Sequence, residues 1–192
     1  MNMMNELITE RLILREFTGM DWPAMYEIFS NPDVARYIYA MNEAQCRDWV
    51  TDKLKQQYNR EPIPASRAVV LREENRLIGY VQLALPMNVG DGVPGELALD
   101  YALHRSFWGR GYMTEAARRM IRFAFETLHV PQIVATCETS NVASARVMEK
   151  AGLVYAATFM KLERDASETP HRRYEIDKAR YETEVRHGSF LD

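Results

Sequence analysis

Apolar and polar residues follow two periods along this chain, one typical of helices and the other typical of strands. The helical period is clearest after residue 111, where apolar residues recur every three or four positions. These residues are Met113, Ala116, Ala117, Met120, Ile121, Ala124, Phe125 and Leu128. The pattern predicts an amphipathic helix that buries one face.

Two further helices are expected before residue 60. We expect the carboxylate of Asp21 to cap the first of them, and the Asn-Pro pair at 31–32 to stop it. The second begins at Asn42, because Asn42 and Gln45 three residues later resemble a capping box. Its apolar spacing ends near residue 58.

Apolar runs between turn residues predict the strands. They are expected at residues 12–14, 68–71, 77–85, 96–103, 133–137, 153–162 and 172–181, with turns at 73–76 and 167–170 and a loop at 86–95. A short helix capped by Asn141 is expected to run to residue 150 and to end before a glycine at 152. This order predicts an α/β (α+β) mixed sheet flanked by helices, and with no linker visible, residues 1–192 are expected to form one domain.

The composition of the chain argues against a nucleic-acid partner, a metal site and a disulfide. The 24 Lys and Arg residues against 27 Asp and Glu residues leave a formal charge of -3, which argues against a dedicated nucleic-acid partner. The four histidines are scattered without metal-ligand spacing, so no metal is expected. Cys46 and Cys137 stand among apolar residues, which favours two buried thiols over a disulfide. Neither a signal peptide nor a membrane span is visible, and a cytoplasmic location is predicted.

The segment from Tyr101 to Glu115 carries the clearest chemical signal. A predicted strand passes through Gly109 and Gly111 into the long helix, which places unpaired backbone N–H groups at the positive end of a helix dipole. Five arginines and one acid lie between residues 104 and 122. The turn therefore favours an anion such as a phosphate, although a plain strand-to-helix corner is the alternative. The glycine spacing matches neither a Walker A loop nor a full dinucleotide fingerprint.

A second motif supports the anion site. Ser140, Asn141 and Ser144 open a helix that closes with MEKAGL at 148–153. Together with FWGRGYMTEA at 107–116, this resembles the GNAT superfamily of acetyl-CoA-dependent N-acetyltransferases, and within it the ribosomal-protein (Rim-type) branch. The opening residues 9–15 (TERLILR) are similar to that branch's first strand, so the resemblance covers almost the whole chain.

The resemblance implies how acetyl-CoA is held, without a metal. Its pyrophosphate is expected on the backbone N–H groups and the cationic side chain of the glycine turn and following helix, at Gly109, Arg110, Gly111, Tyr112, Met113 and Thr114. Its pantetheine is expected beside a strand that splays from its neighbour, along Tyr101, Ala102 and Leu103. Asn141 is expected to contact the pantetheine or phosphate arm, and Ser144 to lie near the sulfur.

Departures from the family pattern leave the catalytic groups open. Met148 stands where many relatives have a proton-donating Tyr, and Ser144 is our candidate for that role, unless it only belongs to the first helical turn. Ala98 stands where many relatives have a Glu. The general base is therefore Asp100, Glu96 or an ordered water, with structural roles as the alternative for both carboxylates.

The family implies attack of a neutral primary amine on the acetyl thioester. The first-choice acceptor is the α-amine of a protein or peptide, and the second is a small-molecule amine such as a polyamine, an aminoglycoside or an amino-acid derivative. Aromatic candidates for holding the amine are Trp22, Tyr37, Tyr39 and Tyr174. A CoA-binding regulatory module without turnover and a generic nucleotide-binding domain remain alternatives, and a homodimer is a prediction from the family alone.

Overall fold

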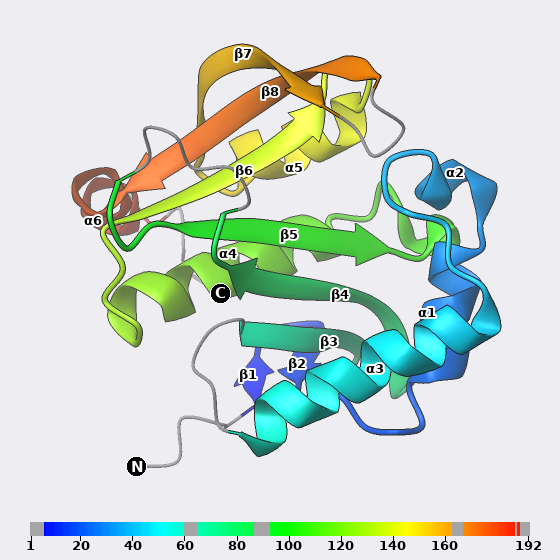
Figure 1. Cartoon of the computed structure of the whole chain (residues 1–192). Helices are drawn as coiled ribbons and strands as arrows, with labels where there is room; N and C mark the ends of the chain where they lie inside the picture. Colours follow the sequence, from blue (N-terminus) through cyan, green and yellow to red (C-terminus); the bar gives the residue numbers. More distant parts are fainter. Residues whose placement is uncertain (1–5, 60–64, 87–92, 163–166, 187, 189–192) are drawn as a thin grey trace.

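The computed structural model describes residues 6–59, 65–86, 93–162, 167–186 and 188. In these residues an eight-stranded mixed sheet has helices on both faces (Figure 1). The strand order is β1-β2-β3-β4-β5-β6-β8-β7. The strands are β1 (Leu7–Ile8), β2 (Leu12–Arg15), β3 (Ala65–Leu71), β4 (Arg76–Ala84), β5 (Leu97–Leu103), β6 (Gln132–Glu138), β7 (Val154–Leu162) and β8 (Glu168–Asp177). The predicted mixed sheet flanked by helices is confirmed.

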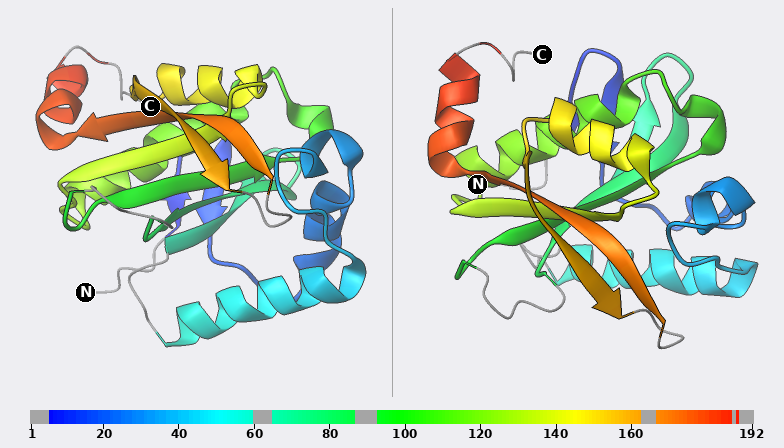
Figure 2. Two further views of the ribbon diagram at one scale, coloured as in Figure 1. Left: turned by 45° about the horizontal axis from the view of Figure 1, so that its top comes forward. Right: turned by 90° about the horizontal axis from the view of Figure 1, so that it is seen from above.

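Two apolar cores form because the helices cover opposite faces of the sheet (Figure 2). One face carries α1 (Trp22–Phe29), α2 (Pro32–Ala35) and α3 (Glu43–Tyr58), and the other carries α4 (Tyr112–Glu126) and α5 (Val142–Lys150). On the α3 face, Trp49 packs edge-on against Phe29 and Tyr80. On the α4 face, the predicted apolar side of the helix is buried, including Met120 and Ile121.

The pairing of β5 positions the candidate site. β5 is antiparallel to β4 over six residue pairs, from Ala98 to Leu103. It is parallel to β6 over only two pairs, Leu97 with Ile133 and Ala98 with Val134. Beyond residue 98 the two strands separate, so the C-terminal half of β5 has no strand partner on its β6 side. This confirms the splayed strands that the family resemblance implies.

Side-chain caps mark the starts of α2, α3 and α5. The capping box of Asn42 and Gln45 is present, with 2.9 Å between the Asn42 Oδ1 and the Gln45 backbone N. Asn31 does not only stop α1, because its side chain accepts from the Asp33 backbone N and caps α2, which the sequence analysis missed.

The predicted cap by Asp21 is wrong, although the helix begins where expected. The Asp21 carboxylate accepts two hydrogen bonds from the Arg15 guanidinium, at 2.7 and 2.8 Å, and one from the Thr18 backbone N. It makes no side-chain bond to α1. A cation on the preceding strand therefore takes the carboxylate that the helix would otherwise use.

The C-terminal hairpin is displaced from its predicted position. Residues 168–170, expected in a turn, belong to β8, and β8 ends at Asp177 instead of continuing to Tyr181. A helix missed by the sequence analysis, α6 (Lys178–Arg186), follows. Asp177 Oδ1 accepts from the Arg180 backbone N, and the Tyr181 ring stacks on Phe125 with 4.7 Å between centroids. These contacts favour a helix over a longer strand.

The two cysteines lie in different cores and are both free and buried, as favoured from the sequence. Cys46 belongs to the core under α1 and α3, and Cys137 to the core under α4 and α5. The central part of the predicted loop at 86–95 lies outside the described residues.

Candidate functional site

A cavity of about 370 Å³ opens beside the splayed half of β5. It gathers three parts of the chain that are far apart in the sequence: α2 with the residues that follow it, the end of β5 with the glycine turn and the start of α4, and α5. Ten of the residues predicted to bind the cofactor line it, namely Tyr101, Ala102, Leu103, Gly109, Gly111, Tyr112, Met113, Thr114, Asn141 and Ser144. Their roles in binding stay a prediction.

The glycine turn has the backbone geometry that the anion site requires. Gly109 and Gly111 have φ values of 76° and 82°, in the region that side chains other than glycine rarely adopt. Gly111 is the N-cap of α4 and makes no side-chain cap, so the first N–H groups of that helix are left for another acceptor. The indole Nε1 of Trp108 donates to the Leu103 carbonyl at 2.8 Å and fastens the turn to the end of β5.

Arg110 differs from its neighbours in the turn, because it is not among the residues that line the cavity. Its guanidinium lies 5.6 Å from the centre of the Phe107 ring. The predicted contact between this side chain and a phosphate stays a prediction.

The start of α5 faces the end of β5 across the cavity. Asn141 Oδ1 accepts from the Ser144 backbone N at 3.0 Å and caps the helix. The Tyr101 hydroxyl lies 2.9 Å from Ser144 Oγ and donates to the Ser144 carbonyl at 3.1 Å. Burial raises the pKa of Tyr101 and keeps its hydroxyl protonated. This arrangement places two hydroxyl groups in the cavity wall.

Asp100 is next to the cavity but does not line it. Its carboxylate accepts from the Tyr80 hydroxyl at 2.9 Å and from Gln82 Nε2 at 3.1 Å, and Lys53 Nζ donates to Gln82 Oε1 at 2.9 Å. Asp100 is exposed to solvent, and neighbouring protein groups remove part of the hydration of its carboxylate. This loss of solvation raises the pKa of the carboxyl, while the bond from Tyr80 opposes the shift. A carboxylate with a raised pKa beside the cavity suits a general base.

Glu96 lies at the other end of the same strand and is 3% exposed. Its Oε2 pairs with Arg173 at 3.1 Å, and its Oε1 is buried without a hydrogen-bond partner. It does not line the cavity. The structure does not bring Glu96 together with the other predicted site residues.

The four aromatic candidates for holding an amine are spread over the molecule. Tyr37 lines the cavity, and its hydroxyl lies 3.5 Å from the Ser140 carbonyl across the mouth. Trp22 lies under the Arg47 guanidinium, and Tyr39 is exposed and outside the cavity. Tyr174 is buried and donates to Glu149. Of the four, only Tyr37 is among the cavity residues.

The sequence analysis missed two cations in the cavity wall, Arg146 and Lys150. They lie on the exposed side of α5, one helical turn apart and next to Ala143 and Val147, which also line the cavity. Ala143, Arg146, Val147 and Lys150 are three or four positions apart and share one face of α5, but this spacing alone does not show that the face meets the cavity. Two cations beside the glycine turn add to its suitability for a phosphate-bearing ligand.

Within the described residues, no group of three His, Cys, Asp or Glu side chains is placed to hold a metal ion. None of the helices in the same part of the chain is both long and apolar enough to cross a membrane.

Comparison with known proteins agrees with this geometry. Residues 11–154 match the family model of the acetyltransferase (GNAT) domain. The chain is 31% identical over 157 residues to the N-acetyltransferase YnaD of Bacillus subtilis, covering 81% of this chain and 86% of that protein.

Solved structures show the same fold. A GNAT-family acetyltransferase from Bacillus anthracis superposes with a TM-score of 0.75 at 26% identity, covering 91% of this chain and 99% of that one. The ribosomal-protein-S5-alanine acetyltransferase of Vibrio fischeri has a TM-score of 0.75 at 17% identity, covering 90% of this chain and 96% of that one. The chain therefore belongs to the GNAT family and is an acetyl-CoA-dependent N-acetyltransferase.

Proposed function

We propose that this N-acetyltransferase moves the acetyl group of acetyl-CoA to the α-amine of a protein or peptide, by direct attack while both substrates are bound. The observation that supports the proposal is the lining of the cavity, which includes the glycine turn and has no Asp or Glu among its described residues. The glycine turn, Arg146 and Lys150 suit the phosphates of CoA, and the splayed half of β5 leaves space for the pantetheine.

The absence of carboxylates from the described cavity wall bears on the acceptor. A polyamine or an aminoglycoside carries several positive charges and needs several carboxylates to replace the water around them. The wall beside α2 instead offers Val34, Tyr37 and Ile38, which are apolar or aromatic. A single amine on a neutral peptide backbone fits this surface better.

We assign the general base to Asp100. The amine must lose a proton to attack, because an ammonium nitrogen has no lone pair. Of the two candidate carboxylates, Asp100 lies two residues beyond Ala98, the last residue of β5 that pairs with β6. Glu96 is instead held in an ion pair with Arg173. The new C–N bond forms as the C–S bond breaks, the amine proton passes to Asp100 directly or through a water, and the electron pair leaves with the thiolate.

The thiolate needs little assistance, because the pKa of a thiol is only about 8.5. Ser144 is the candidate to pass a proton to it, giving free CoA, while a proton from solvent replaces the one that the hydroxyl gives up, so that no serine alkoxide remains. Its hydroxyl lies in the cavity wall and is in hydrogen-bond contact with Tyr101.

The test is acetyl transfer to a panel of amines, followed by release of free CoA thiol and by the mass of the acetylated product. The panel contains peptides with free α-amines, the same peptides with blocked α-amines and one lysine, a polyamine and an aminoglycoside. The proposal expects the free α-amines to be preferred. Faster transfer to the polyamine or aminoglycoside would contradict the acceptor, and CoA binding without thiol release for any amine would favour the regulatory module. Cytoplasmic location and dimer formation stay predictions.

A further inference from the structure

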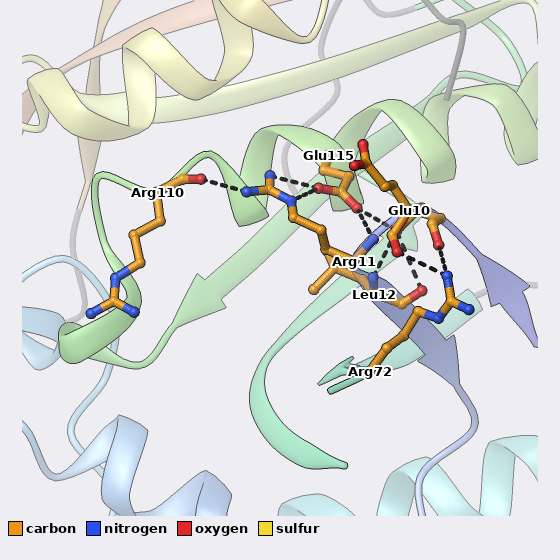
Figure 3. Close-up of polar contacts among 7 residues, drawn as sticks. Glu10, Arg11, Leu12, Arg72, Arg110 and Glu115 are labelled. Atoms are coloured by element: carbon orange, nitrogen blue, oxygen red, sulfur yellow. Dashed lines mark hydrogen bonds and ion pairs between the residues drawn. The ribbon is translucent and has the colours of Figure 1, made fainter. Parts of the chain in front are cut away.

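The side chain of Arg11 contacts both the glycine turn and the first turn of α4 (Figure 3). The Arg11 Nη1 donates to the Arg110 carbonyl at 3.0 Å, in the middle of the turn. Its Nε and Nη2 contact Glu115 Oε2 at 2.7 and 2.6 Å, in the first turn of α4. The same guanidinium lies 4.5 Å from the centre of the Tyr112 ring. One side chain therefore contacts the turn and the helix that follows it.

The contact with the Arg110 carbonyl determines the direction of a backbone N–H. In a trans peptide the C=O and the following N–H point in opposite directions. Since the Arg110 carbonyl points toward Arg11, the Gly111 N–H points away from Arg11. Gly111 lines the cavity and Arg11 does not, which agrees with an N–H on the cavity side of the turn.

This peptide needs a support because glycines lie on both sides of Arg110. Gly109 and Gly111 both have positive φ, and glycine crosses between backbone regions at little cost. The peptide between Arg110 and Gly111 could otherwise turn its carbonyl toward the cavity, where it would repel a phosphate. The hydrogen bond from Arg11 favours the orientation that presents the N–H.

Arg11 is itself held firmly. Glu115 Oε1 accepts from the Arg11 backbone N at 2.9 Å and from the Thr9 hydroxyl at 2.5 Å. Arg72 supports the same segment from the other side, because its Nη1 donates to the carbonyls of Thr9 and Glu10 at 3.0 and 2.8 Å (Figure 3). The Arg11 side chain is 41% exposed, but Glu115 is only 15% exposed, so the pair is partly shielded from water.

We infer that Arg11 is a positioning residue for acetyl-CoA, which acts by orienting the Arg110–Gly111 peptide so that the Gly111 N–H meets the pyrophosphate. The inference rests on the proposed role of the glycine turn in binding that pyrophosphate. Arg11 has no contact with the cavity, so it acts only through the turn.

The test compares acetyl-CoA with acetyl-pantetheine, a thioester that lacks the pyrophosphate. In Arg11→Met, the KM for acetyl-CoA should rise about tenfold to hundredfold with kcat nearly unchanged. The reason is that the Gly111 N–H is no longer held in place for its hydrogen bond to the charged pyrophosphate. The kinetic constants for acetyl-pantetheine should match those of the wild type. Arg11→Lys keeps the charge but not the fork that reaches both partners, so its KM should be intermediate.

Arg180→Met is the matched control. Arg180 also joins a backbone carbonyl, that of Gly152, to a carboxylate, that of Glu184, and it does not line the cavity. Its kinetics with both thioesters should resemble the wild type. An equal loss with both thioesters in Arg11→Met and Arg11→Lys would show a merely structural role and overturn the inference, as would unchanged constants with both. If the wild-type enzyme uses the two thioesters equally well, the pyrophosphate site itself fails, and this is seen before any variant is made.

Discussion

The surroundings of Asp100 change the acidity of its carboxyl. It lies on β5 beside the splayed end, and it accepts hydrogen bonds from Tyr80 and Gln82. Burial raises the pKa of its carboxyl above the usual value of 3.8. Burial also lowers the pKa of Lys53, the nearest cation in this network. A carboxylate that has lost part of its hydration is protonated at a higher pH than a fully hydrated Asp.

We expect Asp100→Asn to lower kcat by about 10²- to 10⁴-fold, because the amide cannot take the amine proton. In the wild type, kcat/KM should fall as the pH drops through the raised pKa of Asp100, since only the ionised carboxylate is a base. Asp52→Asn, in an exposed pair with Lys55, is the control and should keep wild-type rates. An Asp100→Asn enzyme of normal rate would assign the base to an ordered water instead.

Ionisation of Asp100 supports catalysis but should lower the stability of the folded protein. The pKa of Asp100 is higher in the folded protein than in the unfolded chain, where it is near 3.8. The folded state therefore gains stability from the protonated carboxyl below pH 3.8, and it loses this gain as the pH rises through the folded pKa. The ionised Asp100 therefore lowers the stability of the wild type near neutral pH. Thermal unfolding at pH 7 should show a higher Tm for Asp100→Asn than for the wild type, and a lower Tm would contradict the raised pKa.

The candidate site could be predicted where its signals are local. The glycines at 109 and 111 and the Asn141 cap mark their positions by short-range backbone requirements, and the cavity includes all three. Arg146, Lys150 and Tyr37 carry no such signal, because they reach the cavity only through the packing of α5 and α2. The same reason applies to Glu96, whose partner Arg173 is 77 positions away.

At the scale of elements, the predictions hold where a cap is satisfied within its own segment. Asn42 and Gln45 satisfy each other, and α3 begins as predicted. The Asp21 cap fails because Arg15 binds the carboxylate from another element. The end of β8 was misplaced because Tyr181 has the polarity of a strand residue, and its helical position depends on stacking against Phe125.

Variants of two helix-capping residues, Asn141 and Asn42, distinguish an effect on stability from an effect on cofactor binding. Asn141→Ala and Asn42→Ala each remove a side chain that caps a helix, and each should lower the free energy of unfolding by about 1 kcal/mol. Only Asn141 lines the cavity, so only Asn141→Ala should also weaken CoA binding measured by titration calorimetry. Equal CoA affinities in the two variants would remove Asn141 from the cofactor site.

Gly79 allows β4 to lie close to β5 near the splayed end. A Cβ added at this position would lie 2.4 Å from the Ala102 backbone O, and a strand carbonyl has little freedom to move away. Gly79→Ala should therefore destabilise the protein by about 1–3 kcal/mol in denaturant unfolding. At Gly19 the added Cβ meets nothing within 4 Å, so Gly19→Ala should leave stability within about 0.5 kcal/mol. Similar losses for both would refute the steric explanation.

At the scale of the whole molecule, the cavity exists because one sheet has helices on both faces and two of its central strands, β5 and β6, separate. α1 and α3 hold β3 and β4 from one side, and α4 and α5 hold the other side (Figure 2). β5 stays with β4 while β6 stays with β8, so the two halves diverge after residue 98. The α4 N-terminus and the α5 N-terminus then meet at one opening. Periodicity along the chain predicts the elements, but this divergence was expected only through the family resemblance.

The most direct measurement is an amide NMR titration of the ¹⁵N-labelled protein with CoA and with pantetheine. We expect the Gly109 and Gly111 amide signals to shift on addition of CoA and to stay in place on addition of pantetheine, because only CoA carries the pyrophosphate. Signals from the end of β5 should shift with both ligands. If CoA binds while the Gly109 and Gly111 signals remain unmoved, the backbone of the glycine turn does not hold the phosphates and the central claim is contradicted.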